Sequence, residues 1–266
     1  MVVPAIGTLA EGAFGAHPGR WPLPTARTGE ELWLRAVAAG GQGRYGSARA
    51  DLGAVLRDGG PLSALACATL GSFLRQQGWH EQAARWDGRA FTAAAGDVEA
   101  AVDALVGLAA DSLGVGRLAR SSALLDRAER LHDDADAVPP RLAVRLAWVR
   151  AELAMVTGQG ESAVAHAREA RELLARQESS LRRHAVKSRV VLAAALCSLG
   201  EVEESRAVAD AALIEAGEHG LVPLRWALAC LLADIGSDRL PPAEVGRIRT
   251  ADAAFVVRHG GRWNSR

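Results

Sequence analysis

Three glycines near the N-terminal end of the chain have the spacing of a phosphate-binding loop. Gly41, Gly43 and Gly46 follow the pattern G-x-G-x-x-G, and the small residue Ser47 comes next. In dinucleotide-binding proteins such glycines let the backbone approach a pyrophosphate between a β-strand and a helix. The residues before Gly41 read GEELWLRAVAAG, where apolar side chains recur with helical spacing rather than with the alternation of a strand. The context therefore argues against a dinucleotide site, and we expect no cofactor.

A histidine and three aspartates form a second candidate site, for a metal ion. His132, Asp133, Asp134 and Asp136 stand directly before a Pro-Pro start of a helix, in the sequence HDDADAVPP. Imidazole and carboxylate groups are common metal ligands, but a hydrated acidic loop is the usual outcome for such a stretch. We predict no metal site here. The sequence also lacks G-x-S-x-G, P-loop, H-E-x-x-H and C-x-x-C motifs, so we expect a protein without enzymatic activity.

A basic stretch is the third candidate, because it could bind a phosphate or an acidic partner. Its residues are Arg182, Arg183, His184, Lys187 and Arg189. Glutamates lie close by in the sequence, and the whole chain has 31 basic and 31 acidic residues. With a formal net charge of zero, nothing attracts the protein strongly to nucleic acid. We predict that His184 lies on a solvated polar helix face.

The glycine-rich junction recurs along the chain, and this answers the question that the first glycines raise. Each copy consists of a helical stretch, a glycine and a second helical stretch. The marker glycines are Gly43, Gly78, Gly116, Gly158 and Gly200, with a weaker sixth at Gly236. A small residue follows five positions after each of the first five, namely Ala48, Ala83, Ser121, Ala163 and Ser205. This is typical of repeated helical hairpins, in which glycine ends the first helix and a small residue lets the second pack closely.

One copy, CATLGSFLRQQGWHEQAARWDGRAF, resembles the tetratricopeptide repeat (TPR) family. Leu70-Gly71, Gly78, Ala83 and Ala90 stand in the register of that family's pattern. The other copies keep the turn glycine and the small residues but lose Leu-Gly and the closing proline, and their period exceeds the family's usual ~34 residues. The resemblance extends over about residues 29–236, and the chain is similar to the helical-repeat arms of bacterial transcriptional regulators. It implies an all-α fold, a right-handed α-solenoid of about five to six antiparallel helix hairpins.

The predicted organisation has three parts. Residues 1–28, rich in glycine and proline, are expected to be an extended or disordered arm. Residues 29–248 form the repeat domain, and residues 249–266 form a C-terminal cap and a basic tail. The predicted helix pairs are 29–41 with 44–57, 61–77 with 79–94, 97–113 with 117–133, 139–157 with 160–177, 180–199 with 201–216, and 221–235 with a short 241–248. No segment has the features of a secretory signal or the ~20 apolar residues of a membrane span, so we expect a cytoplasmic protein.

The resemblance also implies a binding groove, because the first helices of TPR hairpins line the concave face. The residues that match its groove positions are Trp33, Val37, Arg75, Asp103, Arg145, Trp148, Glu152, Met155, Lys187 and Trp226. Aromatic anchors with charges of both signs suit a bound peptide or helix. The alternative is that the tryptophans are core residues; if Trp148 lines the groove, Trp148→Ala should weaken binding without unfolding the chain. The clamp of chaperone-binding TPRs is not expected, since Arg145 and Lys187 match it but its asparagine has no counterpart.

These patterns favour a non-enzymatic adaptor that binds a segment of another protein in its concave groove. The alternative is a regulatory module, associated with transcription or nucleic acid, that uses the basic tail with Arg258, Arg262 and Arg266 around Trp263. A small-molecule sensor or enzyme with a pocket inside the superhelix is the third hypothesis. We expect no membrane partner, and the oligomeric state, a homodimer included, stays open.

Overall fold

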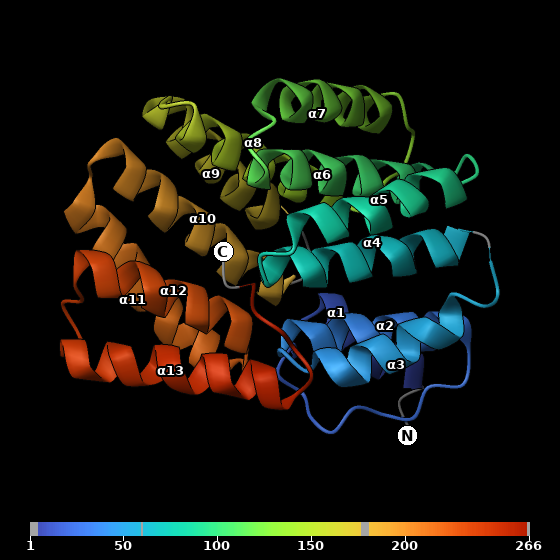
Figure 1. Ribbon diagram of the computed structural model, residues 1–266, viewed down its shortest axis with the longest axis horizontal. Coiled ribbons are helices and arrows are strands. Elements are labelled where there is room, and N and C mark those ends of the chain that lie inside the picture. Colours follow the sequence, from blue (N-terminus) through green and yellow to red (C-terminus); the bar gives the residue numbers. More distant parts are fainter. Residues whose placement is uncertain (1–4, 60, 177–180, 265–266) are drawn as a thin grey trace.

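The computed structural model describes residues 5–59, 61–176 and 181–264, and within these ranges the protein is all-α, with no strand. Figure 1 shows the helices wound in sequence order around the molecule. The helices are α1 (Ala5–Phe14), α2 (Gly29–Gly41), α3 (Tyr45–Val55), α4 (Pro61–Gln76), α5 (His80–Ala93), α6 (Val98–Gly114), α7 (Leu118–Asp133), α8 (Arg141–Val156), α9 (Gly160–Ala175), α10 (Arg182–Leu199), α11 (Val202–Glu218), α12 (Val222–Ile235) and α13 (Pro242–Arg258). None of the described helices combines the length and apolarity needed to cross a bilayer.

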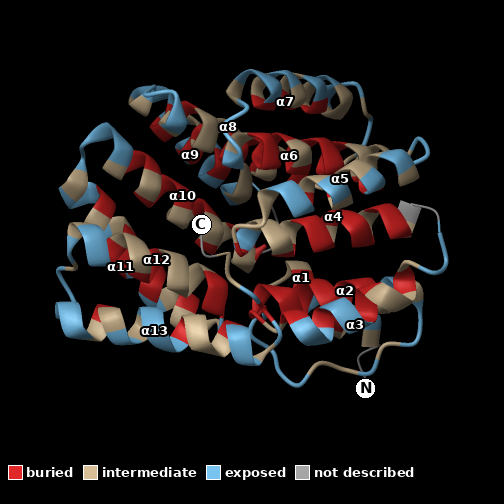
Figure 2. Cartoon of the chain, viewed as in Figure 1, coloured by how far each residue is buried: buried red, intermediate tan, exposed pale blue. Residues whose placement is uncertain are grey.

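Consecutive helices from α2 onward pack in pairs, as the repeated junctions predict. The five marker glycines from Gly43 to Gly200 all have φ between +73° and +94°, the left-handed conformation that suits glycine. The hydrogen bonds at each corner are alike: the N–H of the residue after the glycine donates to a carbonyl five residues back, as Trp79 does to Leu74 at 2.9 Å. The small residues after each corner are fully buried, Ala83 among them. Figure 2 shows exposed residues along the outer faces of α7 and α13.

The N-terminal arm differs from the expectation, because it contains α1. Leu9 and Ala13 of this helix are buried in the same apolar cluster as Trp33, and the Phe14 ring lies 5.5 Å from the Trp33 ring. The sequence analysis did not predict this helix, because it took the many glycines and prolines of residues 1–28 as the sign of an extended or disordered arm. Packing against α2 stabilises a helix that would be marginal alone.

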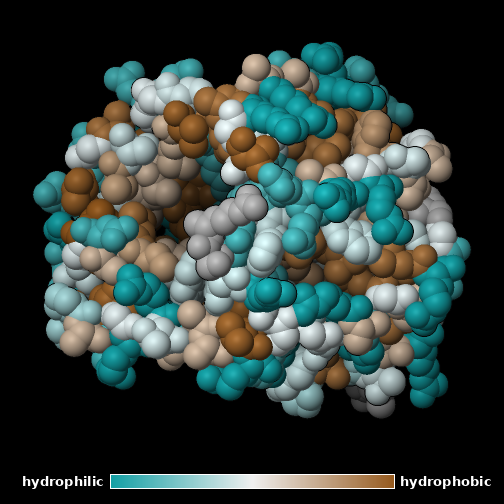
Figure 3. Space-filling model, viewed as in Figure 1, coloured by the Kyte–Doolittle hydropathy of each residue, from teal (hydrophilic) through white to brown (hydrophobic). Residues whose placement is uncertain are grey.

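The C-terminal segment also differs, because it joins the last hairpin to the first. Helix α13 extends to Arg258, and the carbonyl of His259 then accepts a hydrogen bond from the Gly46 N–H at 2.7 Å. The Asn264 N–H donates to the Gln77 carbonyl at 2.9 Å. Through these contacts the row of hairpins closes on itself. It surrounds a hollow, and Figure 3 shows the surface recessed between α10 and α12 with apolar side chains on the wall.

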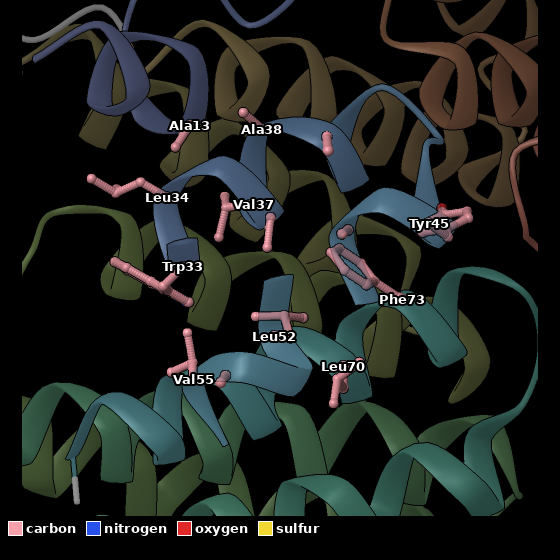
Figure 4. Close-up of a cluster of buried hydrophobic side chains, with 14 of the residues drawn as sticks. Ala13, Trp33, Leu34, Val37, Ala38, Tyr45, Leu52, Val55, Leu70 and Phe73 are labelled. Carbon is pink, nitrogen blue, oxygen red and sulfur yellow. The ribbon is translucent and has the colours of Figure 1, made fainter. Parts of the chain in front are cut away.

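The largest core cluster lies under the first hairpins, as Figure 4 shows. The Tyr45 side chain is fully buried beside Phe73, at a ring distance of 5.2 Å, and its hydroxyl donates to Gln76 Oε1 at 3.1 Å. Burial raises the pKa of Tyr45 above its ordinary value, so this hydroxyl stays protonated. Trp33 and Val37, which the sequence placed in the groove, belong to this core.

Candidate binding cavity

The hollow is a cavity of about 380 Å³. Its walls come mainly from α4, α6, α8, α10 and α12, the first helices of their hairpins, and Gly41 at the end of α2 and His80 at the start of α5 complete them. This volume lies in the usual range for ligand pockets, ~300–1,000 Å³. The repeat interpretation expected the first helices to line the binding groove, and these helices line most of the hollow. It did not anticipate that the last hairpin meets the first.

The structure brings together six of the ten predicted groove residues. The six that line the cavity are Arg75, Arg145, Trp148, Glu152, Lys187 and Trp226. Of the other four, Trp33 and Val37 are core residues, Asp103 is buried behind the wall, and Met155 packs against the core around α8 and α9.

The tryptophans divide between the two alternatives that the sequence left open. Trp33 is a core residue whose Nε1 donates to Thr69 Oγ1 at 3.1 Å. Trp148 does both, because it lines the cavity yet is only 8% exposed, and its Nε1 donates to Ser188 Oγ at 2.8 Å. Trp226 is half-buried and stacks on Trp263 at 4.1 Å. A change at Trp148 therefore affects core packing as well as the cavity.

A buried charge cluster positions Arg75 at the cavity wall. Its Nη1 lies 2.8 Å from Asp87 Oδ2 and 2.5 Å from Asp111 Oδ1, and donates to the Gly107 carbonyl at 3.0 Å. Burial raises the pKa of Asp87 well above its usual value; Arg75 opposes this effect and Asp111 adds to it. Burial alone would lower the pKa of Arg75, but the charges of Asp87 and Asp111 raise it overall. The cluster orients the Arg75 side chain, and its carboxylates balance the positive charge of the guanidinium.

Two glycines make room for the Asp87 carboxyl group. A Cβ at Gly71 would lie 2.7 Å from its oxygens, and a Cβ at Gly107 would lie 2.5 Å from its Cγ. Gly71 is the glycine of the Leu-Gly pair, so this part of the pattern has a local steric role. The sequence interpretation missed Asp87. The available signal was its place between Ala83 and Ala90 on the buried face of α5, where a charged residue needs an internal partner.

A second cluster pairs two predicted site residues with each other. Asp103 Oδ1 lies 2.9 Å from Arg145 Nε and 3.4 Å from Arg141 Nη1, and Arg141 also pairs with Glu99. Burial raises the pKa of Asp103, but the charges of Arg145 and Arg141 outweigh burial and leave it lowered, so Asp103 is ionised. A third, more exposed pair joins Lys187 and Glu152, whose Nζ and Oε1 atoms lie 3.3 Å apart.

Arg183 and His184 differ from both clusters, and the prediction of a solvated face for His184 was wrong. Arg183 lines the cavity, and its Nε is buried without a hydrogen-bond partner among the described residues. Burial lowers its pKa to about 10, and the charges of Arg145 and Arg141 act in the same direction. His184 is 4% exposed and stacks on Trp148 at 5.5 Å, and no described residue hydrogen-bonds to its Nδ1. Burial, followed by the charge of Arg183, lowers its pKa well below the ordinary value, so His184 is neutral.

The other candidate residues form no reactive group. Within the described ranges, no three histidine, cysteine, aspartate or glutamate side chains gather as a metal site would require, and the contact of His132 is with Asp133 at 3.1 Å. Cys67, Cys197 and Cys230 are free thiols.

The arrangement can bind a ligand by apolar contact and charge. No protein-family model and no curated protein sequence matches the chain.

Proposed function

We propose that the protein is a non-enzymatic interaction module that holds a segment of a partner protein inside its closed row of hairpins. In this proposal the chain is a divergent TPR-like repeat protein, a right-handed solenoid of five to six hairpins. The repeat assignment is supported by the five glycine corners, which share a left-handed backbone conformation and the same hydrogen bond. The observation that carries the function is the cavity of about 380 Å³ between the first helices.

The wall of the cavity has the chemistry that peptide recognition needs. Trp148 and Trp226 offer aromatic surface, and apolar residues such as Val190 and Leu224 extend it. The Lys187–Glu152 pair, with both side chains 32% exposed, is accessible to polar groups of a bound segment. Aromatic anchors supply affinity and charged groups at the rim supply selectivity.

The alternative function through the basic tail has less support. Proteins that bind single-stranded nucleic acid use exposed aromatic rings on which the bases stack. Trp263 instead stacks on Trp226 and donates from Nε1 to the Ala253 carbonyl at 3.2 Å. The Arg262 carbonyl is bound by Trp79 Nε1 at 2.6 Å. The tail thus has a structural task in closing the row of hairpins.

A peptide library tests the proposal with the full chain. Random peptides displayed with free C-termini are selected on the wild type, and enriched peptides are measured by fluorescence polarisation. Ala227→Trp fills the cavity, which Ala227 lines, whereas Ala211→Trp makes the same change at an exposed position of α11. We expect the first variant to bind at least about tenfold more weakly and the second to bind like the wild type.

Thermal melting of both variants is the control for folding. The proposal fails if no peptide is enriched, or if folded Ala227→Trp binds the enriched peptides as tightly as the wild type does.

A further inference from the structure

Four arginine and lysine side chains line the cavity, and three of them have a carboxylate partner within the protein. The pairs, with their N–O distances, are Arg75 with Asp111 (2.5 Å), Arg145 with Asp103 (2.9 Å) and Lys187 with Glu152 (3.3 Å). Arg183 is the fourth, and it forms no ion pair with any residue that the structure describes. Arg183 is half-buried, and its Nε is buried without a hydrogen-bond partner among the described residues. Partial burial of a cation without a carboxylate partner is costly, so its place in a ligand cavity favours an anion.

The fold holds Arg183 firmly in this place. It lies in the first turn of α10, where the helix dipole adds to the positive potential. Its stem packs against Gly41, since a Cβ at Gly41 would lie 2.8 Å from Arg183 Cδ. The first glycine of the G-x-G-x-x-G pattern therefore makes room for an arginine rather than for a pyrophosphate.

A second, independent observation points to a ligand with a polar group. His184 lines the same cavity, is 4% exposed, and leaves Nδ1 without a hydrogen-bond partner in the part of the chain that the structure describes. Buried polar atoms in folded proteins are almost always hydrogen-bonded. Burial is the main cause of the lowered pKa values of Arg183 and His184; the charges of Arg145 and Arg141 act in the same direction, which agrees with an excess of positive potential here.

The type of anion follows from the number of free cations. One unpaired guanidinium matches one negative charge, and its planar fork fits a carboxylate in a bidentate geometry. A phosphate monoester carries up to about two negative charges at neutral pH and would need a second free cation. Trp148, Trp226 and Val190 also line the cavity, and they favour a ligand whose remaining part is apolar or aromatic.

We propose that the cavity binds an amphipathic monocarboxylate, whose carboxylate pairs with Arg183 and whose apolar body packs against Trp148 and Trp226. The inference concerns the same cavity as the proposed function and rests on its being a binding site. Such a ligand has two sources, the C-terminal carboxylate of a peptide or a free organic acid. The experiment therefore uses both.

Isothermal titration calorimetry on the full chain compares each acid with its neutral amide. The small probes are 4-phenylbutyrate and indole-3-butyrate with their amides, and the peptide probes are N-acetyl tripeptides ending in Phe, Trp or Leu as free acids and as amides. We expect the acids to bind roughly 10- to 100-fold more tightly than the amides, the usual range for a hydrogen bond to a charged group.

Two variants assign that preference to the arginine. Arg183→Gln should abolish the difference between acid and amide. Arg182→Gln, which alters a neighbour that faces Glu215 at 3.6 Å outside the cavity, should retain it. Thermal melting should show no loss of stability in Arg183→Gln, since the change removes a half-buried charge that has no ion pair among the described residues. A large loss would show that Arg183 is held for structural reasons and would count against the inference.

The outcomes separate this inference from the proposed function. If small acids bind through Arg183 and no peptide does, the inference holds and the peptide proposal fails. If peptides bind equally as acids and amides, the peptide proposal holds and the inference is overturned. The inference is also overturned if no acid binds, or if Arg183→Gln keeps the preference for acids.

Discussion

Substitution of Gly107 by alanine tests the buried charge cluster most directly. The new Cβ would lie 2.5 Å from Asp87 Cγ, a distance that real Cβ atoms do not reach, and Asp87 is fully buried and paired with Arg75 at 2.8 Å. Alanine in a helix interior is favoured over glycine by about 0.5–1 kcal/mol. Overpacking costs about 1–3 kcal/mol, and complete loss of a buried ion pair about 3–5 kcal/mol. With the pair weakened rather than lost, we expect a net loss of about 2–3 kcal/mol in the free energy of unfolding.

Urea denaturation followed by circular dichroism measures this change against two references. Gly88 lies in α5, the helix that contains Asp87, and a Cβ there would meet nothing within 4 Å. Gly88→Ala should therefore raise the free energy of unfolding by about 0.5–1 kcal/mol. In an Asp87→Ala background, where Arg75 keeps Asp111, Gly107→Ala should no longer destabilise. The reasoning is refuted if Gly107→Ala stabilises the wild type as Gly88→Ala does, or if its cost is unchanged without the Asp87 carboxyl group.

Three further predictions concern the cavity and the closure of the row. The pKa of His184 is lowered in the folded state, so as the pH falls the unfolded chain binds a proton at this residue before the folded chain does. The free energy of unfolding should therefore decrease below about pH 6.5, by up to ~1.4 kcal/mol per pH unit. Urea denaturation at several pH values should show a smaller decrease in His184→Phe. Trp148→Ala should cost about 3–5 kcal/mol, contrary to the expectation for a pure groove residue, and a loss below ~1 kcal/mol in urea denaturation would contradict its place in the core. Trp263→Ala removes the stack on Trp226 and should speed hydrogen exchange of the Gly46 amide, which His259 holds at 2.7 Å; unchanged protection would show that closure does not depend on this ring.

The opening glycine pattern shows how three similar residues acquire different tasks in the folded chain. Gly43 is the hairpin corner, with φ +80°. Gly41 gives space to Arg183, and Gly46 lies against the His259 backbone, whose oxygen would be 3.2 Å from a Cβ. The corner could be predicted because it repeats locally. The other two tasks depend on residues more than a hundred positions away, which no spacing within the motif indicates.

The amino-acid sequence by itself determined the hairpins: where they turn and which small residues let their helices meet. Those features depend on contacts within about one repeat, so the same residues recur with each copy. Only the tertiary structure decided that α1 joins the core, that the last hairpin meets the first, and that Arg183 has no ion-pair partner among the described residues inside the cavity. Closure depends on the small rotation between neighbouring hairpins, summed over the whole row, and that sum is set by long-range packing that no single repeat contains.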